Sequence, residues 1–215
     1  LSRWSKIHSK QKEMIPNDSK SLLLKAAICG FLAGDGSVQK RKDGNFYHHQ
    51  IDFFPDNKLM LETYIKQIKK IYDKTPSIKV EKNYYSVRFN SRIVLEDLSN
   101  ISKFGLRNWN LPKSLFKIKG AKENWLKAFF SAEAYVGKKA IKVQTINQKS
   151  MKKVSNLLKG LGIENNYYEY NSKKVSDSPV GIIMITRISS RLKYHDSIGF
   201  WHSKKTLALK ESLDL

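Results

Sequence analysis

Hydrophobic residues in the first half of the chain switch between helical and strand spacing in a definite order. Asp43-Gly44 lies between two alternating segments and predicts a β-hairpin, and Lys82-Asn83 predicts a second one. After Pro55 the apolar positions recur at helical spacing. The predicted elements are a helix over 21–34, strands over 37–40 and 46–54, a helix from residue 55, strands over 77–80 and 84–89, and a helix over 92–98.

The second half repeats this order. Residues 30–35 line up with 128–133, and residues 88–92 line up with 187–191, displacements of 98 and 99 residues. Two separate matches at nearly the same displacement predict a pseudo-twofold α+β fold of tandem αββαββα repeats, each with an antiparallel sheet. The predicted elements are a helix over 121–133, short strands on either side of Gly137, a helix over 148–160, strands over 165–170 and 181–188, and short helices near Arg191 and Lys204.

Loop-forming residues separate the two repeats. Gly105, Pro112 and Gly120 mark the stretch between them as a connection. The predicted organisation is a basic N-terminal segment (1–16), a first repeat (17–101), a connector (102–120) and a second repeat (121–215).

The charge narrows the choice of partner. The 215 residues include 40 Lys and Arg against 19 Asp and Glu, a net charge of +21 spread along the whole chain. This excess predicts nucleic acid as the partner, with an anionic membrane surface, or a basic composition without a binding role, as alternatives. One cysteine excludes an internal disulfide framework, and the five histidines lack zinc-ligand spacing. With no signal peptide and no bilayer-length apolar run, we expect an intracellular, non-membrane protein.

Two helices of the repeat end in an acidic residue behind a stripe of small residues. Gly30 and Gly34 lie four residues apart, and alanines at 128 and 132 take the corresponding places. If these stripes pack together, Asp35 and Glu133 meet at one end, where the helix dipoles disfavour negative charge. A divalent cation such as Mg²⁺ would neutralise such a cluster and assist phosphodiester hydrolysis. The alternatives are a tight helix crossing without chemistry, or two separate solvated carboxylates.

At these residues the sequence resembles a known family. Residues 28–36 (ICGFLAGDG) resemble the LAGLIDADG motif of homing endonucleases, and 126–134 (LKAFFSAEA) resemble its second copy. The order of elements is similar to that of the monomeric, two-motif members. Segments 107–112 and 197–200, with Lys204-Lys205, add to the resemblance, which covers roughly 20–210.

The resemblance implies a metal-dependent DNA endonuclease. It assigns Asp35 and Glu133 as catalytic metal ligands, with the carbonyls of Gly34 and Ala132 as further ligands of Mg²⁺ or another divalent cation such as Mn²⁺. It implies a saddle of two sheets over the DNA major groove, paired motif helices at its centre, and staggered cuts in both strands of a long site. It also implies a basic residue near the metals, for which Arg88 and Arg187 are the candidates that the repeat places equivalently. The family usually has glycine where this sequence has Ala134, so alanine is expected to add strain or shift Glu133.

Strand alternation predicts the face toward DNA. Tyr47, His49, Ile51 and Phe53 are expected to cover the helices. The opposite face and the hairpin tips are expected to meet bases or phosphates. The predicted DNA-binding residues are Lys40, Arg41, Lys42, His48, Gln50, Asp52, Ser86, Arg88, Lys138, Lys139, Lys142, Gln144, Lys173, Lys174 and Arg187.

Three functions remain open on the sequence alone. The first is a site-specific double-strand DNA endonuclease acting as a monomer in a DNA-containing compartment, either a prokaryotic cytoplasm or an organelle. The second is a non-cleaving DNA- or RNA-binding protein on the same scaffold, such as a maturase that binds its own intron RNA. The third is an unrelated basic RNA-binding protein.

Overall fold

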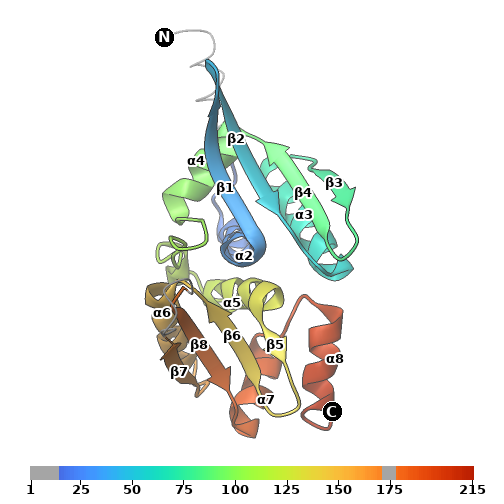
Figure 1. Ribbon diagram of the computed structural model, residues 1–215, viewed down its shortest axis with the longest axis vertical. Helices are drawn as coiled ribbons and strands as arrows, with labels where there is room; N and C mark the ends of the chain where they lie inside the picture. The colour runs from blue at the N-terminus through green and yellow to red at the C-terminus, as the bar shows by residue number, and fades with distance from the viewer. Residues whose placement is uncertain (1–14, 171–177) are drawn as a thin grey trace.

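The computed structural model describes residues 15–170 and 178–215, and it divides into two similar halves (Figure 1). The predicted order of elements is confirmed, including the short helices near Arg191 and Lys204. The elements are α2 (Ser19–Asp35), β1 (Gly36–Asp43), β2 (Phe46–Phe53), α3 (Lys58–Tyr72), β3 (Ser77–Val80), β4 (Tyr85–Asn90), α4 (Arg92–Ile101), a 3-10 turn (Leu115–Lys117), α5 (Ala121–Glu133), β5 (Tyr135–Val136), β6 (Ile141–Thr145), α6 (Gln148–Gly160), β7 (Asn166–Tyr170), β8 (Val180–Ile185), α7 (Ile188–Ser197) and α8 (Ser203–Glu211).

Each half builds one four-stranded antiparallel sheet with the same topology. The strand orders are β1-β2-β4-β3 and β5-β6-β8-β7, which confirms the pseudo-twofold α+β architecture. The first hairpin is much longer than its counterpart, because β1 pairs with β2 over its eight residues whereas β5 has two residues. No helix among the described residues is long and apolar enough to cross a membrane.

Local side chains explain where the helices begin. The Asp18 carboxylate accepts hydrogen bonds from the backbone nitrogens of Lys20 and Ser21 at 3.0 and 3.1 Å, so α2 begins slightly earlier than predicted. Asn57 caps α3 in the same way, through a 3.1 Å bond from the nitrogen of Leu59. The last predicted strand is shorter than expected, because Arg187 is already the N-cap of α7.

The centre of the molecule is the contact between α2 and α5 (Figure 1). A methyl group added at Gly30 would collide with the carbonyl oxygen of Trp125 and lie 2.8 Å from the Ala128 Cβ. One at Gly34 would lie 2.5 Å from the Ala132 Cβ. The small residues therefore form the helix interface, as the sequence predicted.

Aromatic residues beside this interface fill the two flanking cores. Phe31 of α2 packs at ring-centroid distances of 5.1 Å from Phe53 and 5.5 Å from Trp201. Phe129 of α5 lies 4.9 Å from both Trp109 and Trp125. Each motif helix thus contacts its partner helix through small residues and the flanking cores through large ones, and Trp201 of the second repeat packs on Phe31 of the first.

Strand alternation correctly predicts which side chains of the sheets face the helices. The buried residues are Ile51, Phe53, Val87, Phe89, Ile141 and Val143. Tyr47 is an exception, because it is 53% exposed although it shares a face with Ile51. The β1-β2 hairpin extends past the helices that cover the rest of the sheet (Figure 1). Alternation therefore predicts which face a side chain lies on, but not whether a helix covers that face.

We expect Gly30→Ala to lower the free energy of unfolding by about 1–3 kcal/mol, because the added methyl group overpacks the α2–α5 contact. Gly160→Ala is the control, since no atom lies within 4 Å of a methyl group placed there. Chemical denaturation of both variants measures the effect. An unchanged stability of Gly30→Ala would show that the helices are not in close contact.

Candidate functional site

The two acidic residues lie at the same end of the central helix pair. Gly30 faces Ala128, and four residues later Gly34 faces Ala132, so the two helices run parallel. Asp35 is the last residue of α2 and Glu133 the last residue of α5. The structure therefore brings these two predicted residues together and excludes two separate solvated helix ends.

Burial and neighbouring carboxylates favour the protonated forms of both acids. The pKa of Asp35 is raised to about 6, mainly by burial and further by Asp56, while Lys205 opposes the shift. The pKa of Glu133 is raised to about 7 by burial and by Asp35, again opposed by Lys205. The two carboxylates thus have too little positive charge around them to be fully ionised at neutral pH.

Lys205 is a site residue that sequence reasoning did not assign. Its ammonium group donates hydrogen bonds to the carbonyl oxygens of Ser131 and Ala132, at 2.6 and 2.9 Å. Burial lowers the pKa of Lys205, and Asp56, Asp35 and Glu133 oppose that change. Lys205 lies in a segment that contributed to the family resemblance, but no local pattern connects it to Ala132, 73 residues away.

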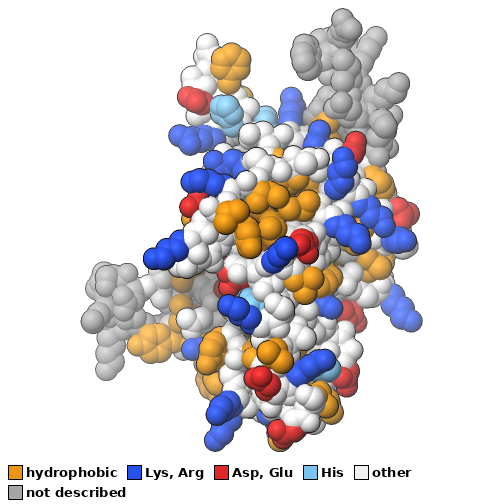
Figure 2. Space-filling model, turned by 90° about the vertical axis from the view of Figure 1, so that its right-hand side faces the viewer, with side chains coloured by type: hydrophobic (Ala, Val, Ile, Leu, Met, Phe, Trp, Pro, Cys, Tyr) orange, Lys and Arg blue, Asp and Glu red, His pale blue; other side chains and the backbone are white. Residues whose placement is uncertain are grey.

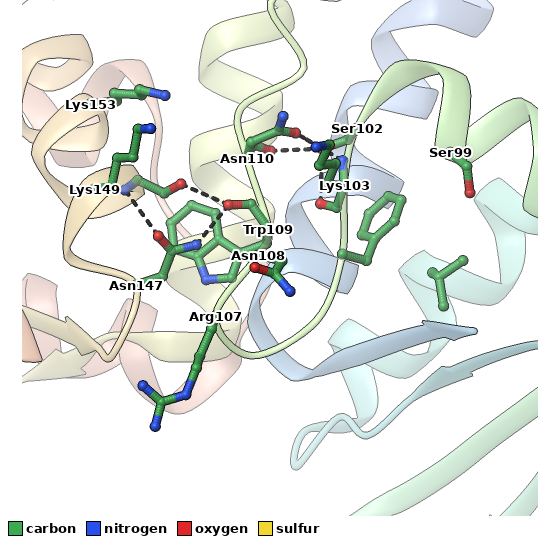
Figure 3. A pocket seen from close by; sticks show the side chains of 13 residues that line it. Ser99, Ser102, Lys103, Arg107, Asn108, Trp109, Asn110, Asn147, Lys149 and Lys153 are labelled. Atoms are coloured by element: carbon green, nitrogen blue, oxygen red, sulfur yellow. Dashed lines mark hydrogen bonds between the residues drawn. The ribbon is translucent and has the colours of Figure 1, made fainter. Parts of the chain in front are cut away.

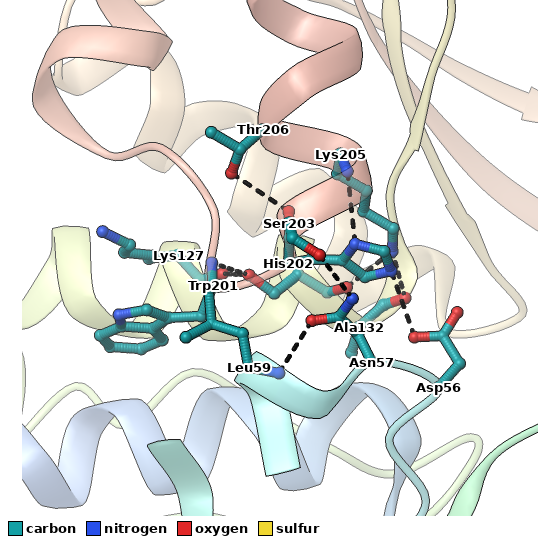
Figure 4. A network of polar contacts seen from close by, with 11 residues as sticks. Asp56, Asn57, Leu59, Lys127, Ala132, Trp201, His202, Ser203, Lys205 and Thr206 are labelled. Atoms are coloured by element: carbon teal, nitrogen blue, oxygen red, sulfur yellow. Dashed lines mark hydrogen bonds and ion pairs between the residues drawn. The ribbon is translucent and has the colours of Figure 1, made fainter. Parts of the chain in front are cut away.

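A polar network holds the helix that carries Lys205 (Figure 4). His202 caps α8 by accepting a 3.3 Å hydrogen bond from the backbone nitrogen of Lys205 through its Nδ1. The Nε2 of the same ring lies 3.3 Å from Oδ1 of Asp56, and this contact lowers the pKa of Asp56. Asn57 donates a 3.0 Å bond to the Ser203 hydroxyl. The start of α3 in the first repeat therefore fixes the start of α8 in the second.

A cavity of about 510 Å³ opens beside this network. It gives the acidic end of the helix pair access to a ligand. Its lining residues are Asp35, Phe54, Asp56, Asn83, Tyr84 and Ala132.

The two candidate arginines are not equivalent in the structure, so their predicted symmetric placement is wrong. Arg88 pairs with Asp52 in the first sheet, whereas the corresponding pair in the second sheet is Lys142 with Met184. Arg187 instead takes the position of Ser91, since each is the N-cap of the helix that follows the strand. The sequence match paired Arg88 with Arg187, whereas the strand register pairs Arg88 with Met184, three residues earlier.

Asp52 is not a free surface group, so the prediction that it meets DNA is wrong. It is 2% exposed and forms a 2.6 Å ion pair with Arg88. Gln50 also donates a 2.5 Å hydrogen bond to it. Alternation places Asp52 on the outer face, but its neighbours cover it and neutralise its charge.

Most other residues predicted to bind DNA are accessible. Arg88 and Arg187 are exposed; Gln50, Ser86 and Lys142 are partly buried. Lysine and arginine side chains spread over the face shown in Figure 2, in keeping with the high net charge. Lys173 and Lys174 lie outside the described residues. The remaining exposed residues of the predicted set are Lys40, Arg41, Lys42, His48, Lys138, Lys139 and Gln144.

Comparisons with known proteins agree with this architecture. Residues 121–199 match a family model described as a LAGLIDADG-like domain. The crystal structure of I-DmoI in complex with DNA and Mn is similar over 83% of this chain and 97% of that one, with 17% identity and a TM-score of 0.65. The homing endonuclease I-WcaI bound to its DNA recognition sequence matches over 99% and 92%, with 15% identity and a TM-score of 0.59.

A third similar structure is the N-terminal LAGLIDADG domain of DUF199/WhiA, at 13% identity and a TM-score of 0.56, covering 92% of this chain and 90% of that one. No curated protein sequence matches the chain. The chain therefore has the two-repeat fold of these structures, and its residues 121–199 match the model of a LAGLIDADG-like domain, in agreement with the resemblance found in the motifs.

Proposed function

We propose that this protein is a site-specific double-strand DNA endonuclease of the homing type, which hydrolyses phosphodiesters with divalent metal held by Asp35 and Glu133. The observation that carries the proposal is the meeting of these two partly buried carboxylates between two basic sheets. Similar structures have been solved with DNA and Mn, and with DNA and Ca. Cleavage by this chain is our inference from its site.

The residues present fit a hard divalent cation. The candidate ligands are all oxygens, namely the two carboxylates and the carbonyl groups of Gly34 and Ala132. No group of three or more His, Cys, Asp or Glu able to hold a metal occurs in the described parts of the chain. Mg²⁺ suits such a site, because it binds through one or two carboxylates and completes its shell with waters and substrate phosphate. Bound there, Mg²⁺ or Mn²⁺ would polarise the phosphate and lower the pKa of a water.

Lys205 supplies the positive charge that the reaction needs on the protein side. Its ammonium group lies at the carbonyls that precede Glu133, within the field of both acids. A fixed cation in this position stabilises the charge that develops on a phosphate in the transition state. We therefore propose Lys205, rather than Arg88 or Arg187, as the basic residue of the site.

The two sheets provide a long DNA-binding surface. Exposed side chains such as Gln144 can read base edges in the major groove, while the hairpin lysines Lys138 and Lys139 contact phosphates. Because both repeats belong to one chain, we propose that a monomer binds the whole duplex site. The protein would act in an intracellular, DNA-containing compartment.

The departure at Ala134 does not favour a non-cleaving maturase. Ala134 has φ −77° and ψ 141°, an ordinary extended conformation for alanine. Its counterpart Gly36 needs to be glycine for a different reason, because a methyl group there would collide with the backbone of Leu32, 2.8 Å from its carbonyl oxygen. The two repeats therefore differ in packing at this point, and alanine adds no backbone strain.

We expect Asp35→Asn and Glu133→Gln each to abolish cleavage while DNA affinity stays within about threefold, since the carboxylates bind metal and not bases. The measurement is cleavage of a randomised DNA library with Mg²⁺, followed by binding to the selected site. Glu62→Gln, which removes an exposed carboxylate on α3, is the control. Cleavage at the wild-type rate by either variant would overturn the assignment. A wild-type protein that binds intron RNA and cuts no DNA would favour the maturase.

Lys205→Met should lower the cleavage rate on the selected site by about 10²–10³-fold, the cost of removing one transition-state donor. Lys204→Met removes the same charge from an exposed neighbour and should leave the rate nearly unchanged. Single-turnover kinetics separate the two variants. Equal rates for both would show that Lys205 only contributes to the overall field.

The double variant Asp35→Asn, Glu133→Gln should be more stable than wild type in EDTA, and increasingly so as pH rises. Both acids have folded pKa values, about 6 and 7, above their ordinary 3.8 and 4.5, so ionising them destabilises the fold. That destabilisation is absent below pH 4, grows up to about pH 7 and then stays constant, at about 3 kcal/mol for each acid. Melting temperatures at pH 4.5 and 8 measure it. A gain that is independent of pH would contradict the raised pKa values.

A further inference from the structure

The connector between the repeats contains a closed loop at residues 103–110 (Figure 3). The backbone nitrogen of Lys103 donates to the Asn110 side chain at 2.8 Å, and the nitrogen of Asn110 donates to the carbonyl of Lys103 at 3.2 Å. The Ser102 hydroxyl adds a 2.7 Å bond to the Asn110 carbonyl. These bonds fasten the two ends of the loop together.

Trp109 anchors the loop to the second repeat. Its side chain is 2% exposed and packs against Phe129 of α5. Its carbonyl accepts bonds from the Asn147 amide and the Ser150 hydroxyl, both at 2.7 Å, at the start of α6 (Figure 3). The loop is therefore held in one place rather than left free between the domains.

The tip of this loop presents an apolar side chain to solvent. Gly105 has φ 105°, which favours glycine, and its carbonyl accepts bonds from the nitrogens of Asn108 and Trp109 at 2.9 and 3.1 Å. The tight turn leaves Leu106 75% exposed. Because the loop is fastened at both ends, Leu106 is held in one exposed position, where it can contact a partner.

Leu106 lies beside the acidic end of the helix pair. Gly105 and Leu106 line a cavity of about 90 Å³ together with Glu133, Gly34 and Gly36. The exposed neighbours Lys103 and Arg107 give the loop positive charge, and Arg107 donates a 2.7 Å bond to Ser178. An apolar tip with cations on both sides suits a nucleic acid, whose bases are apolar on their faces and whose backbone is anionic.

We propose that Leu106 is a wedge that inserts at the central base step of the DNA target from the minor groove. The inference rests on the proposed function. If the two sheets lie in successive major grooves on one face of the duplex, the segment between them turns its minor groove toward the helix ends. Leucine side chains entering the minor groove partly unstack a base step and bend the duplex. Such bending would bring the two scissile phosphates toward the acidic site.

This role also makes Leu106 a determinant of specificity. Unstacking is easiest at flexible pyrimidine–purine steps, so the protein would select the central base pairs by their deformability without hydrogen bonds to them. The polar side chains of the two sheets would select the flanking base pairs. Removing the wedge should therefore relax preference at the centre and leave the flanks unchanged.

The test uses a DNA site selected by binding from a randomised library, with 2-aminopurine at its central step and EDTA present to prevent cleavage. We expect wild type and Leu106→Phe to raise the 2-aminopurine fluorescence on binding, and Leu106→Ala to lose most of that rise. With Mg²⁺, Leu106→Ala should cut roughly tenfold or more slowly, because unstacking is no longer driven by the protein. Ile188→Ala, which truncates an apolar side chain 68% exposed on α7, should match wild type.

The possible results separate this inference from the proposed function. If Leu106→Ala binds the site with wild-type fluorescence and wild-type central preference, the wedge is wrong and the endonuclease assignment stands. If wild type binds the site but does not cut it, the fluorescence comparison still decides for or against the wedge. If wild type selects no DNA, both proposals are overturned, and Leu106 would then mark a contact with another partner.

Discussion

The close approach of α2 and α5 is the constraint on which the rest of the structure depends. Two helices can come this near only where side chains are absent or very small, and a single methyl group at Gly30 would meet the backbone of Trp125. Because the helices run parallel, their C-terminal ends coincide, and the acidic residue that ends each one is brought next to the other. The same contact joins the two repeats, so the fold and the site have one origin.

This arrangement concentrates negative charge where helix dipoles already disfavour it. The ammonium group of Lys205 offsets part of this charge. Lys205 belongs to the C-terminal helix α8, whose start is held by the contact between His202 and Asp56. The candidate site is therefore composite: α2 and Asp56 come from the first repeat, α5 and α8 from the second. One lysine offsets only part of the charge of two carboxylates, so a divalent cation can neutralise the remainder. The two repeats differ here because α8, which carries Lys205, follows the second repeat alone among the described residues.

Sequence patterns correctly predicted the features that depend on residues close together along the chain. Hydrophobic period gave the order of helices and strands, and the small residues at Gly30 and Gly34 predicted the helix contact. Patterns failed where distant segments decide the outcome. Lys205 reaches Ala132 across 73 residues of sequence, and no local spacing reports such a contact. The short sequence segments around Arg88 and Arg187 are similar, but the strand register places the two arginines at different positions of their repeats. Alternation gave the face of Asp52 but not the arginine that pairs with it.

The central claim is that two repeats of one chain build a single metal site from one carboxylate each. Titration of the protein–DNA complex with Mn²⁺, followed by electron paramagnetic resonance, tests it most directly. The account predicts that Asp35→Asn or Glu133→Gln alone weakens Mn²⁺ binding by about tenfold or more, because each carboxylate is a ligand of the shared site. Glu62→Gln should bind Mn²⁺ as wild type does. Wild-type Mn²⁺ binding in both single variants would contradict the account.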